Sequence, residues 1–200
     1  MALLVTFVPS IKATLFQFAS DDIAKLLDSR RLTRAELERR LPPEDLEYLG
    51  KQLAASGWVP MSTYARVSTI AIDLECGGDR EAYLRQAGLR AAARLHKIGL
   101  YQQFEASSEK WGLAVGKILV TLANVSYNFM RWSFEEGDGP VAFRVVIDDA
   151  RHFPEILRIA NEGFIAYFPP NVLGLPKTDV TSERVTPDRI VYTARIESAG

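Results

Sequence analysis

The last third of the chain constrains the fold most, because two alternating apolar and polar runs are joined there by a tight turn. In the first run the apolar residues Met130, Trp132 and Phe134 alternate with polar ones. A Gly-Asp-Gly-Pro sequence at 137–140 predicts the turn, and the second apolar face comprises Val141, Phe143, Val145 and Ile147. Such alternation is typical of strands with one buried face, so the segment predicts a β-hairpin.

A helix and a second pair of strands follow this hairpin. After Pro154, helical spacing places one set of residues on a single face: Phe153, Ile156, Leu157, Ala160, Phe164 and Tyr167. We expect this helix to stop at Phe168-Pro169-Pro170 and strands to occupy 178–185 and 190–196. The order predicts an α+β fold, in which a helical amino-terminal half precedes a ββαββ antiparallel sheet with helices packed on one face.

The amino-terminal half shows helix-start signals instead of strand alternation. We expect helices capped by Ser20, Thr33, Ser62, Asp79 and either Ser107 or Ser108, with another that opens at Pro43 and ends at Gly57. The length fits a single domain over 1–200. Within it, 1–60 would form a helical extension and 61–200 the helices and the ββαββ core.

Net charge, apolar content and cysteine count limit the kinds of molecule that the protein can bind and the compartment that suits it. A net charge of -1 and a pI near 6.2 argue against binding to nucleic acid or anionic lipid. No run of 18 apolar residues is present, so we expect no membrane association. The one cysteine, Cys76, suits a reducing compartment, and we predict a cytoplasmic protein.

Motifs for catalysis and for metal or nucleotide binding are missing from the sequence. It has two histidines, no paired metal-ligand spacing, no phosphate loop and no nucleophile elbow. We therefore predict no cofactor, no metal and no catalytic residue. Two alternatives stay open: His96 as a haem ligand, and Asp149 with His152 as an acid–base pair of an enzyme.

Aromatic residues gather in the second half of the chain and suggest an apolar pocket with a few polar groups. The residues that we predict to line it are Gly88, Trp111, Tyr127, Trp132, Phe164 and Tyr167. Gly88 is a special case, because a glycine inside a helix costs about 1 kcal/mol relative to alanine. It would either leave room for a ligand or permit a tight contact with another element.

Three segments carry a family resemblance. Residues 8–16, 56–64 and 78–88 read VPSIKATLF, SGWVPMSTY and GDREAYLRQAG. In this order they resemble an uncharacterised family, about the length of this chain, that is expanded as paralogues in myxobacteria. More remotely, the second half is similar to 4-vinyl-reductase-type and haem-nitric-oxide-binding-like sensor domains. This resemblance implies a sensor-like fold that binds small molecules, although the cysteine-rich ending of many 4-vinyl-reductase-type domains is missing.

These observations predict a non-enzymatic signalling or regulatory module that binds a small apolar ligand or a partner protein. The first alternative is a structural homodimer without a ligand, formed through an edge strand or the face around Gly88. The second is a sensor that binds haem or another cofactor.

Overall fold

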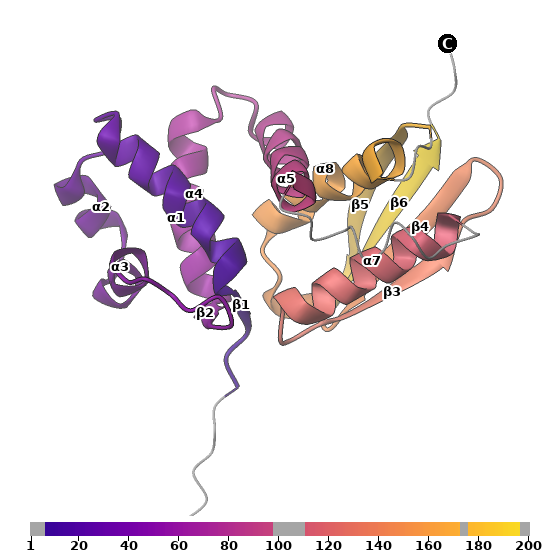
Figure 1. Cartoon of the computed structure of the whole chain (residues 1–200), viewed down its shortest axis with the longest axis horizontal. Coiled ribbons are helices and arrows are strands. Elements are labelled where there is room, and N and C mark those ends of the chain that lie inside the picture. Colours follow the sequence, from indigo (N-terminus) through magenta and orange to yellow (C-terminus); the bar gives the residue numbers. More distant parts are fainter. Residues whose placement is uncertain (1–6, 98–110, 173–175, 197–200) are drawn as a thin grey trace, which may run out of the picture. The chain divides into compact units, whose positions relative to one another are not determined.

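A four-stranded antiparallel sheet carries the ββαββ pattern in the carboxyl-terminal part of the chain (Figure 1). The computed structural model describes residues 7–97, 111–172 and 176–196, except the side chains of residues 111–115, 117 and 118. The strands lie in the order β3-β4-β6-β5, with the bounds β3 (Arg131–Glu136), β4 (Val141–Asp148), β5 (Thr178–Thr186) and β6 (Arg189–Ile196). A short 3-10 helix, η1 (Ala150–His152), and α8 (Glu155–Val172) connect the two hairpins. The predicted α+β class is confirmed.

One face of this sheet is covered by helices. A single row of paired residues crosses all four strands on that face: Phe134, Val145, Tyr192 and Ser182. α7 (Trp111–Ser126) packs against it so closely that a Cβ atom on Gly116 would overlap the Phe134 ring. α8 reaches the same face, where its Glu162 carboxylate accepts a hydrogen bond from the Ser182 hydroxyl at 2.6 Å. Both helices therefore lie on one side, as the alternation predicts.

The opposite face of the sheet is mainly polar, although the central Val146 on it is buried. In the row nearest η1, Asp148 lies between Arg131 and Arg189, and the Arg189 guanidinium is 3.4 Å from the Asp148 carboxylate. Another row pairs Glu135 with Arg144. Arginine and carboxylate side chains that alternate across strands in this way stabilise a solvated face modestly.

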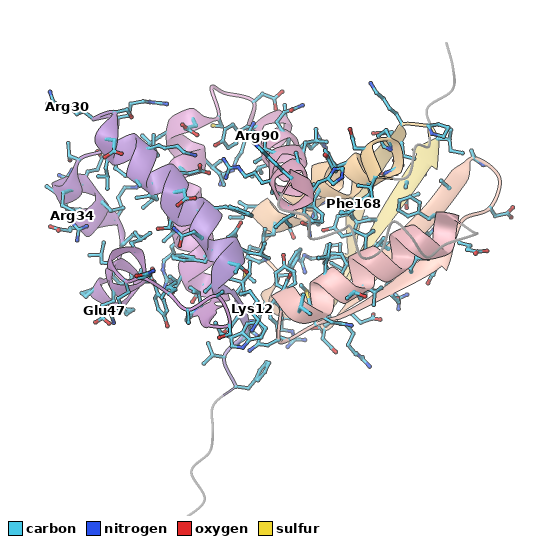
Figure 2. The ribbon with its side chains drawn as sticks, viewed as in Figure 1. Lys12, Arg30, Arg34, Glu47, Arg90 and Phe168 are labelled. Atoms are coloured by element: carbon cyan, nitrogen blue, oxygen red, sulfur yellow. The ribbon has the colours of Figure 1, made fainter. Side chains whose placement is uncertain are left out.

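The chain divides into two compact units. Unit 1 contains residues 7–71 together with Ser126–Phe129, and unit 2 contains the other described residues. The elements of unit 1 are a two-stranded ribbon, three helices and most of a fourth: β1 (Ser10–Lys12), α1 (Ala13–Asp28), α2 (Arg34–Arg40), α3 (Pro43–Gly50), β2 (Trp58–Pro60) and α4 (Met61–Glu75). Its charged side chains at Arg30, Arg34 and Glu47 extend outward (Figure 2). That the two units make up one domain stays a prediction.

Some helix starts follow from neighbouring residues in the sequence, whereas others are set by tertiary packing. Thr33 Oγ1 accepts the Glu36 amide at 3.2 Å, and Asp79 Oδ1 accepts the Ala82 amide at 2.9 Å, so both predicted caps are confirmed. The predicted cap at Ser20 is wrong, because α1 begins at Ala13 and Ser20 lies inside it. Burial explains the longer helix: its apolar face continues backward through Ala19, Phe16 and Ala13.

Three further predicted boundaries are wrong, and one is not described. α4 begins at Met61, so Ser62 does not precede it, and α3 ends at Gly50 instead of Gly57. α8 continues through both prolines to Val172. Each proline removes one backbone amide donor, and the helix ends two residues after Pro170, within the same turn. The candidate caps Ser107 and Ser108 lie outside the described residues.

In the part of the chain that the structure describes, no helix combines the length and the apolar character that crossing a membrane requires.

Candidate functional site

In unit 2, α5 (Arg80–Lys97) packs along α8, which lies between α5 and the sheet (Figure 1). Glycines on both helices bring the two backbones together. A Cβ atom on Gly88 would overlap the carbonyl oxygen of Ala160, and a Cβ atom on Gly163 would overlap the carbonyl oxygen of Arg85. The space beside Gly88 is therefore filled by the backbone of α8, which favours tight packing over a ligand at that position.

A polar pair joins the carboxyl-terminal ends of the same two helices. His96 Nδ1 lies 2.9 Å from the Tyr167 hydroxyl oxygen, and the two rings meet edge to face with centroids 5.9 Å apart. Tyr167 also packs edge to face on Phe168, at 6.2 Å, and Phe168 contacts Phe164 at 5.3 Å. Phe168 (labelled in Figure 2) is fully buried, and the other three side chains are half-buried. The result is an aromatic cluster, His96, Phe164, Tyr167 and Phe168, with polar atoms at one end.

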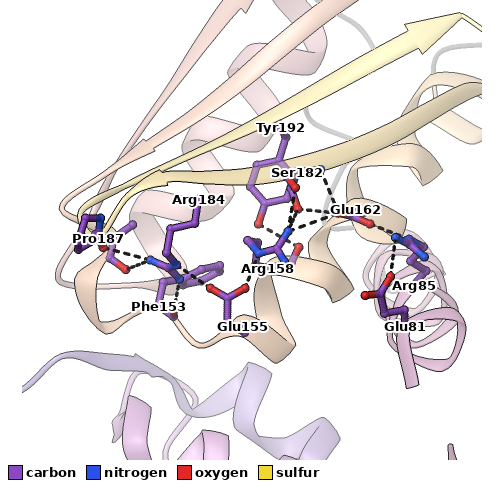
Figure 3. Close-up of polar contacts among 11 residues, drawn as sticks. Glu81, Arg85, Phe153, Glu155, Arg158, Glu162, Ser182, Arg184, Pro187 and Tyr192 are labelled. Carbon is purple, nitrogen blue, oxygen red and sulfur yellow. Dashed lines mark hydrogen bonds and ion pairs between the residues drawn. The ribbon is translucent and has the colours of Figure 1, made fainter. Parts of the chain in front are cut away.

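A buried carboxylate links α5, α8 and β5. Glu162 is 3% exposed, and its two oxygens accept from Arg85 Nε at 2.6 Å and from Ser182 Oγ at 2.6 Å (Figure 3). The hydrogen bond that Arg85 donates to Glu162 raises the pKa of the guanidinium above its usual value. A buried charge must be matched by partners of this kind, so Glu162 fixes the positions of three elements at once.

Glu162 and Arg158 also occupy the outer edge of β5. The Ser182 amide donates to Glu162 Oε1 at 3.0 Å, and the Ser182 carbonyl accepts from Arg158 Nη1 at 2.9 Å (Figure 3). These are the backbone groups that a further strand would otherwise bind. Two side chains of α8 therefore cover this edge of the sheet at Ser182.

Arg184 fastens the far end of β5 to the start of α8. Its guanidinium donates to the carbonyl of Phe153 at 2.7 Å and to Glu155 at 2.6 Å, and it also binds the carbonyls of Ala150 and Pro187 (Figure 3). Burial raises the pKa of Glu155, but hydrogen bonds from Arg158 and Arg184 outweigh burial and leave the pKa below its usual value.

The other predicted pocket residues lie in different surroundings. Trp132, on the covered face of β3, stacks on Tyr192 with centroids 6.4 Å apart. Tyr127 belongs to unit 1, where burial raises the pKa of its hydroxyl and its ring contacts Phe129 at 6.3 Å. Trp111 begins α7, but its side chain lies outside the described part of the chain. The α5–α8 contact thus unites only Gly88, Phe164 and Tyr167 of the predicted set.

The surroundings of the two histidines differ from those that a haem ligand requires. His96 directs Nδ1 to the Tyr167 hydroxyl and packs edge-on against that ring, and its helix touches α8 backbone to backbone at Gly88. His152 is exposed on η1. A haem ligand needs an adjoining flat apolar cavity, and these contacts fit a packed structural pair better than an iron site. Within the described residues, no three side chains of His, Cys, Asp or Glu gather to hold a metal ion.

The acid–base alternative receives little support from the geometry. The Asp149 carboxylate accepts a hydrogen bond from Arg131 Nε at 3.0 Å, and Asp149 and His152 are both exposed. Asp149 adopts a φ of 60°, a conformation that aspartate tolerates at a turn. Asp149 and His152 therefore belong to an exposed connection between a strand and a helix, and they do not form an active site that excludes water.

Sequence reasoning missed a buried charged centre in unit 1. Asp45 is fully buried and accepts from Thr63 Oγ1 at 2.6 Å and from both Nε and Nη2 of Arg66. Burial raises the pKa of Asp45, but hydrogen bonds from Arg66 and Thr63 outweigh it and lower the pKa below its usual value. Asp45 reads as an ordinary residue of the first helical turn, so the sequence carried no signal for this contact between α3 and α4.

Comparison with known proteins identifies the fold. No family model and no curated protein matches the sequence. The chain is similar to the crystal structure of the Fe(II) unliganded H-NOX protein from K. algicida, with a TM-score of 0.57 and 9% identity over 94% of this chain and 98% of that one. A point mutant of the same protein gives a TM-score of 0.55, also at 9% identity, over 94% of this chain and 97% of the other. The architecture is H-NOX-like. At this level of identity the likeness shows the fold alone, and it agrees with the remote resemblance to haem-nitric-oxide-binding-like sensor domains.

Proposed function

We propose that this chain is a non-enzymatic sensor or regulatory module that binds a small, largely apolar ligand beside the His96–Tyr167 pair. The observation that carries the proposal is the aromatic cluster itself. Its aromatic rings, half-buried except for that of Phe168, end in one imidazole and one hydroxyl, and apolar surface with a few placed polar groups is typical of small-molecule sites. The H-NOX-like fold supports the sensor part of the proposal by analogy.

The contacts of α8 provide a route from such a ligand to the sheet. A displacement of Tyr167 moves α8, and Glu162 on the same helix is bonded to Arg85 of α5 and to Ser182 of β5. Closely packed helices transmit movement instead of absorbing it, because their backbones already touch at Gly88 and Gly163. Binding at the aromatic cluster would therefore change the position of β5.

Haem-free binding is part of the proposal. The H-NOX protein from K. algicida carries Fe(II) by its description. In this chain the contacts of His96 favour a structural hydrogen bond, so we propose an organic ligand in place of haem. We further propose that the protein acts in the cytoplasm and belongs to the myxobacterial family that its three sequence segments resemble.

The first experiment is native mass spectrometry of freshly purified protein, paired with an absorbance spectrum. An additional mass that disappears on denaturation would support a bound ligand and give its size. A Soret band would contradict the haem-free version and indicate His96 as a ligand.

A titration then tests the site. Phenol and indole, each an apolar ring with one hydrogen-bonding group, are added while amide signals are followed by NMR. We expect saturable shifts around residues 92–97 and 164–168. Tyr167→Phe should weaken binding about fivefold, the value of one hydrogen bond of about 1 kcal/mol.

Tyr48→Phe is the matched control, because Tyr48 is also half-buried and packs edge to face on Phe16 in unit 1. It should leave binding unchanged. Equal weakening by both variants, or shifts confined to other residues, would contradict the proposed site.

A further inference from the structure

The tip of the hairpin that joins β3 and β4 contains Asp138 followed by Gly139, and no other aspartate or asparagine of the chain precedes a glycine. The Val141 amide closes the turn, because it donates to the Asp138 carbonyl at 3.2 Å. Gly139 has a φ of 58°, a conformation that glycine adopts without strain. Asp138, Gly139 and Pro140 are all exposed at this end of the hairpin (Figure 1). Solvent therefore reaches both the carboxyl group of Asp138 and the amide that follows it.

Neither of these two groups is held by another side chain or carbonyl. Among the residues that the structure describes, the Asp138 carboxylate has no hydrogen-bond or ion-pair partner, and the Gly139 amide donates to no acceptor. Glycine has no Cβ atom that would keep a neighbouring carboxyl carbon away from its nitrogen. The two groups meet only when the turn opens briefly, and the opening of an exposed tip costs little free energy.

Asp28 provides a contrast within the same chain. It precedes the small residue Ser29, but the Ser29 amide donates to the Lys25 carbonyl at 2.9 Å at the end of α1. An amide nitrogen that is bonded in this way cannot approach the side chain of the preceding residue unless the helix end opens first. The structure therefore distinguishes Asp138 from an aspartate that also precedes a small residue.

We propose that Asp138 is a site of spontaneous isoaspartate formation. The Gly139 nitrogen attacks the side-chain carboxyl carbon of Asp138, so that an N–C bond forms and a C–O bond breaks. The amide proton leaves with the hydroxyl group as water, and no atom is oxidised or reduced. Solvent water then opens the five-membered succinimide ring at one of its two carbonyls. One opening restores aspartate, and the other leaves isoaspartate, in which the main chain passes through the side-chain carbon atoms. This chemistry is independent of the proposed ligand site.

Isoaspartate would loosen the end of the hairpin. The main chain gains one carbon atom, and the carbonyl that accepts the Val141 amide becomes part of a free carboxylate. The turn has no room for the longer chain, since even a Cβ atom on Gly137 would overlap the Val141 carbonyl oxygen. The adjoining hydrogen bond, from the Gly137 amide to the Ala142 carbonyl, is 3.1 Å long. We expect hydrogen exchange at the Gly137 and Val141 amides to accelerate about fivefold, the equivalent of one hydrogen bond.

Ageing of the purified full-length chain in heavy-oxygen water tests the proposal. After several weeks at neutral pH and body temperature, proteolysis and mass spectrometry with electron-transfer fragmentation locate isoaspartate and the incorporated heavy oxygen. Both should be found at Asp138. Both should be at least about tenfold less abundant at Asp28, because that site requires the helix end to open.

Asp138→Glu is the matched control, because it keeps the charge while ring closure would have to form a six-membered ring, which is much slower. This variant should show neither product at the tip. Asp138→Asn forms the same succinimide by loss of ammonia, and it should be modified faster than the wild type. An aged wild-type chain without isoaspartate or heavy oxygen at Asp138 would overturn the proposal. Equal modification of Asp28 and Asp138 would overturn the argument that the unbonded Gly139 amide selects the site.

Discussion

Gly88→Ala measures how closely α5 and α8 approach. The added Cβ atom would overlap the Ala160 carbonyl oxygen and lie 2.8 Å from the Phe164 amide nitrogen. Both are backbone atoms, so rotation of a side chain cannot relieve the overlap, and the two helices must move apart. Overpacking of this kind costs about 1–3 kcal/mol, and the backbone contact places this site at the upper end. Alanine recovers about 1 kcal/mol of helix propensity.

We therefore expect Gly88→Ala to lower the free energy of unfolding by about 2 kcal/mol, equivalent to about 4–8 °C in Tm for a chain of this size. Urea denaturation followed by circular dichroism measures it. The control is Gly50→Ala: it lies in a helix, has no atom within 4 Å of the added Cβ, and should not lose stability.

The double variant adds a sharper test. Gly163→Ala introduces the same kind of overlap in the same crossing, with the Arg85 carbonyl oxygen. Once the helices have separated for one methyl group, the second requires less movement, so the two losses should sum to less than their separate values. A stabilised Gly88→Ala protein, as expected of an unconstrained helix, would refute the close contact.

Three further predictions concern the polar contacts. Glu162→Gln should cost about 1–3 kcal/mol in urea denaturation, because it weakens buried hydrogen bonds to a charged group, whereas Glu183→Gln on the exposed face should change stability by less than about 0.5 kcal/mol. Burial raises the pKa of Asp45, but its hydrogen bonds outweigh burial and lower the pKa in the folded protein. Ionised Asp45 therefore stabilises the fold at every pH above its unfolded pKa of about 3.9. This stabilisation is lost as the pH falls through the lower pKa of the folded protein. Denaturation curves of the wild type and Asp45→Asn should thus differ at neutral pH and converge in acid; a constant difference would contradict the assignment. Tyr167→Phe should cost about 1 kcal/mol and shift the NMR signals of the His96 ring, and an unchanged ring spectrum would contradict the hydrogen bond.

Local signals in the sequence predicted much of the fold. Alternation placed Trp132 and Phe134 on one face, and the capping positions of Thr33 and Asp79 are correct because each side chain binds an amide three residues away. Where burial competes with a local signal, the prediction was wrong. Ser20 lies within α1 because packing extends that helix, and α8 passes through Pro169 and Pro170.

The candidate site was predictable only in part. The sequence singled out Gly88, Phe164 and Tyr167, which share the α5–α8 contact, yet it predicted no contact between His96 and Tyr167. Tyr167 lies 71 residues from His96, and a hydrogen bond over that separation leaves no periodic trace in the sequence.

Sequence alone determined which side chains lie on the covered face of the sheet, where several helices begin, and that the chain combines helices with an antiparallel sheet. Those properties depend on neighbours a few residues apart. Tertiary structure alone decided that Gly88 meets a backbone carbonyl, that Glu162 joins three elements, and that side chains of α8 bind the Ser182 backbone on the outer edge of β5. Each of these depends on which distant residue fills the adjoining space, and the spacing of residues along the chain does not record that.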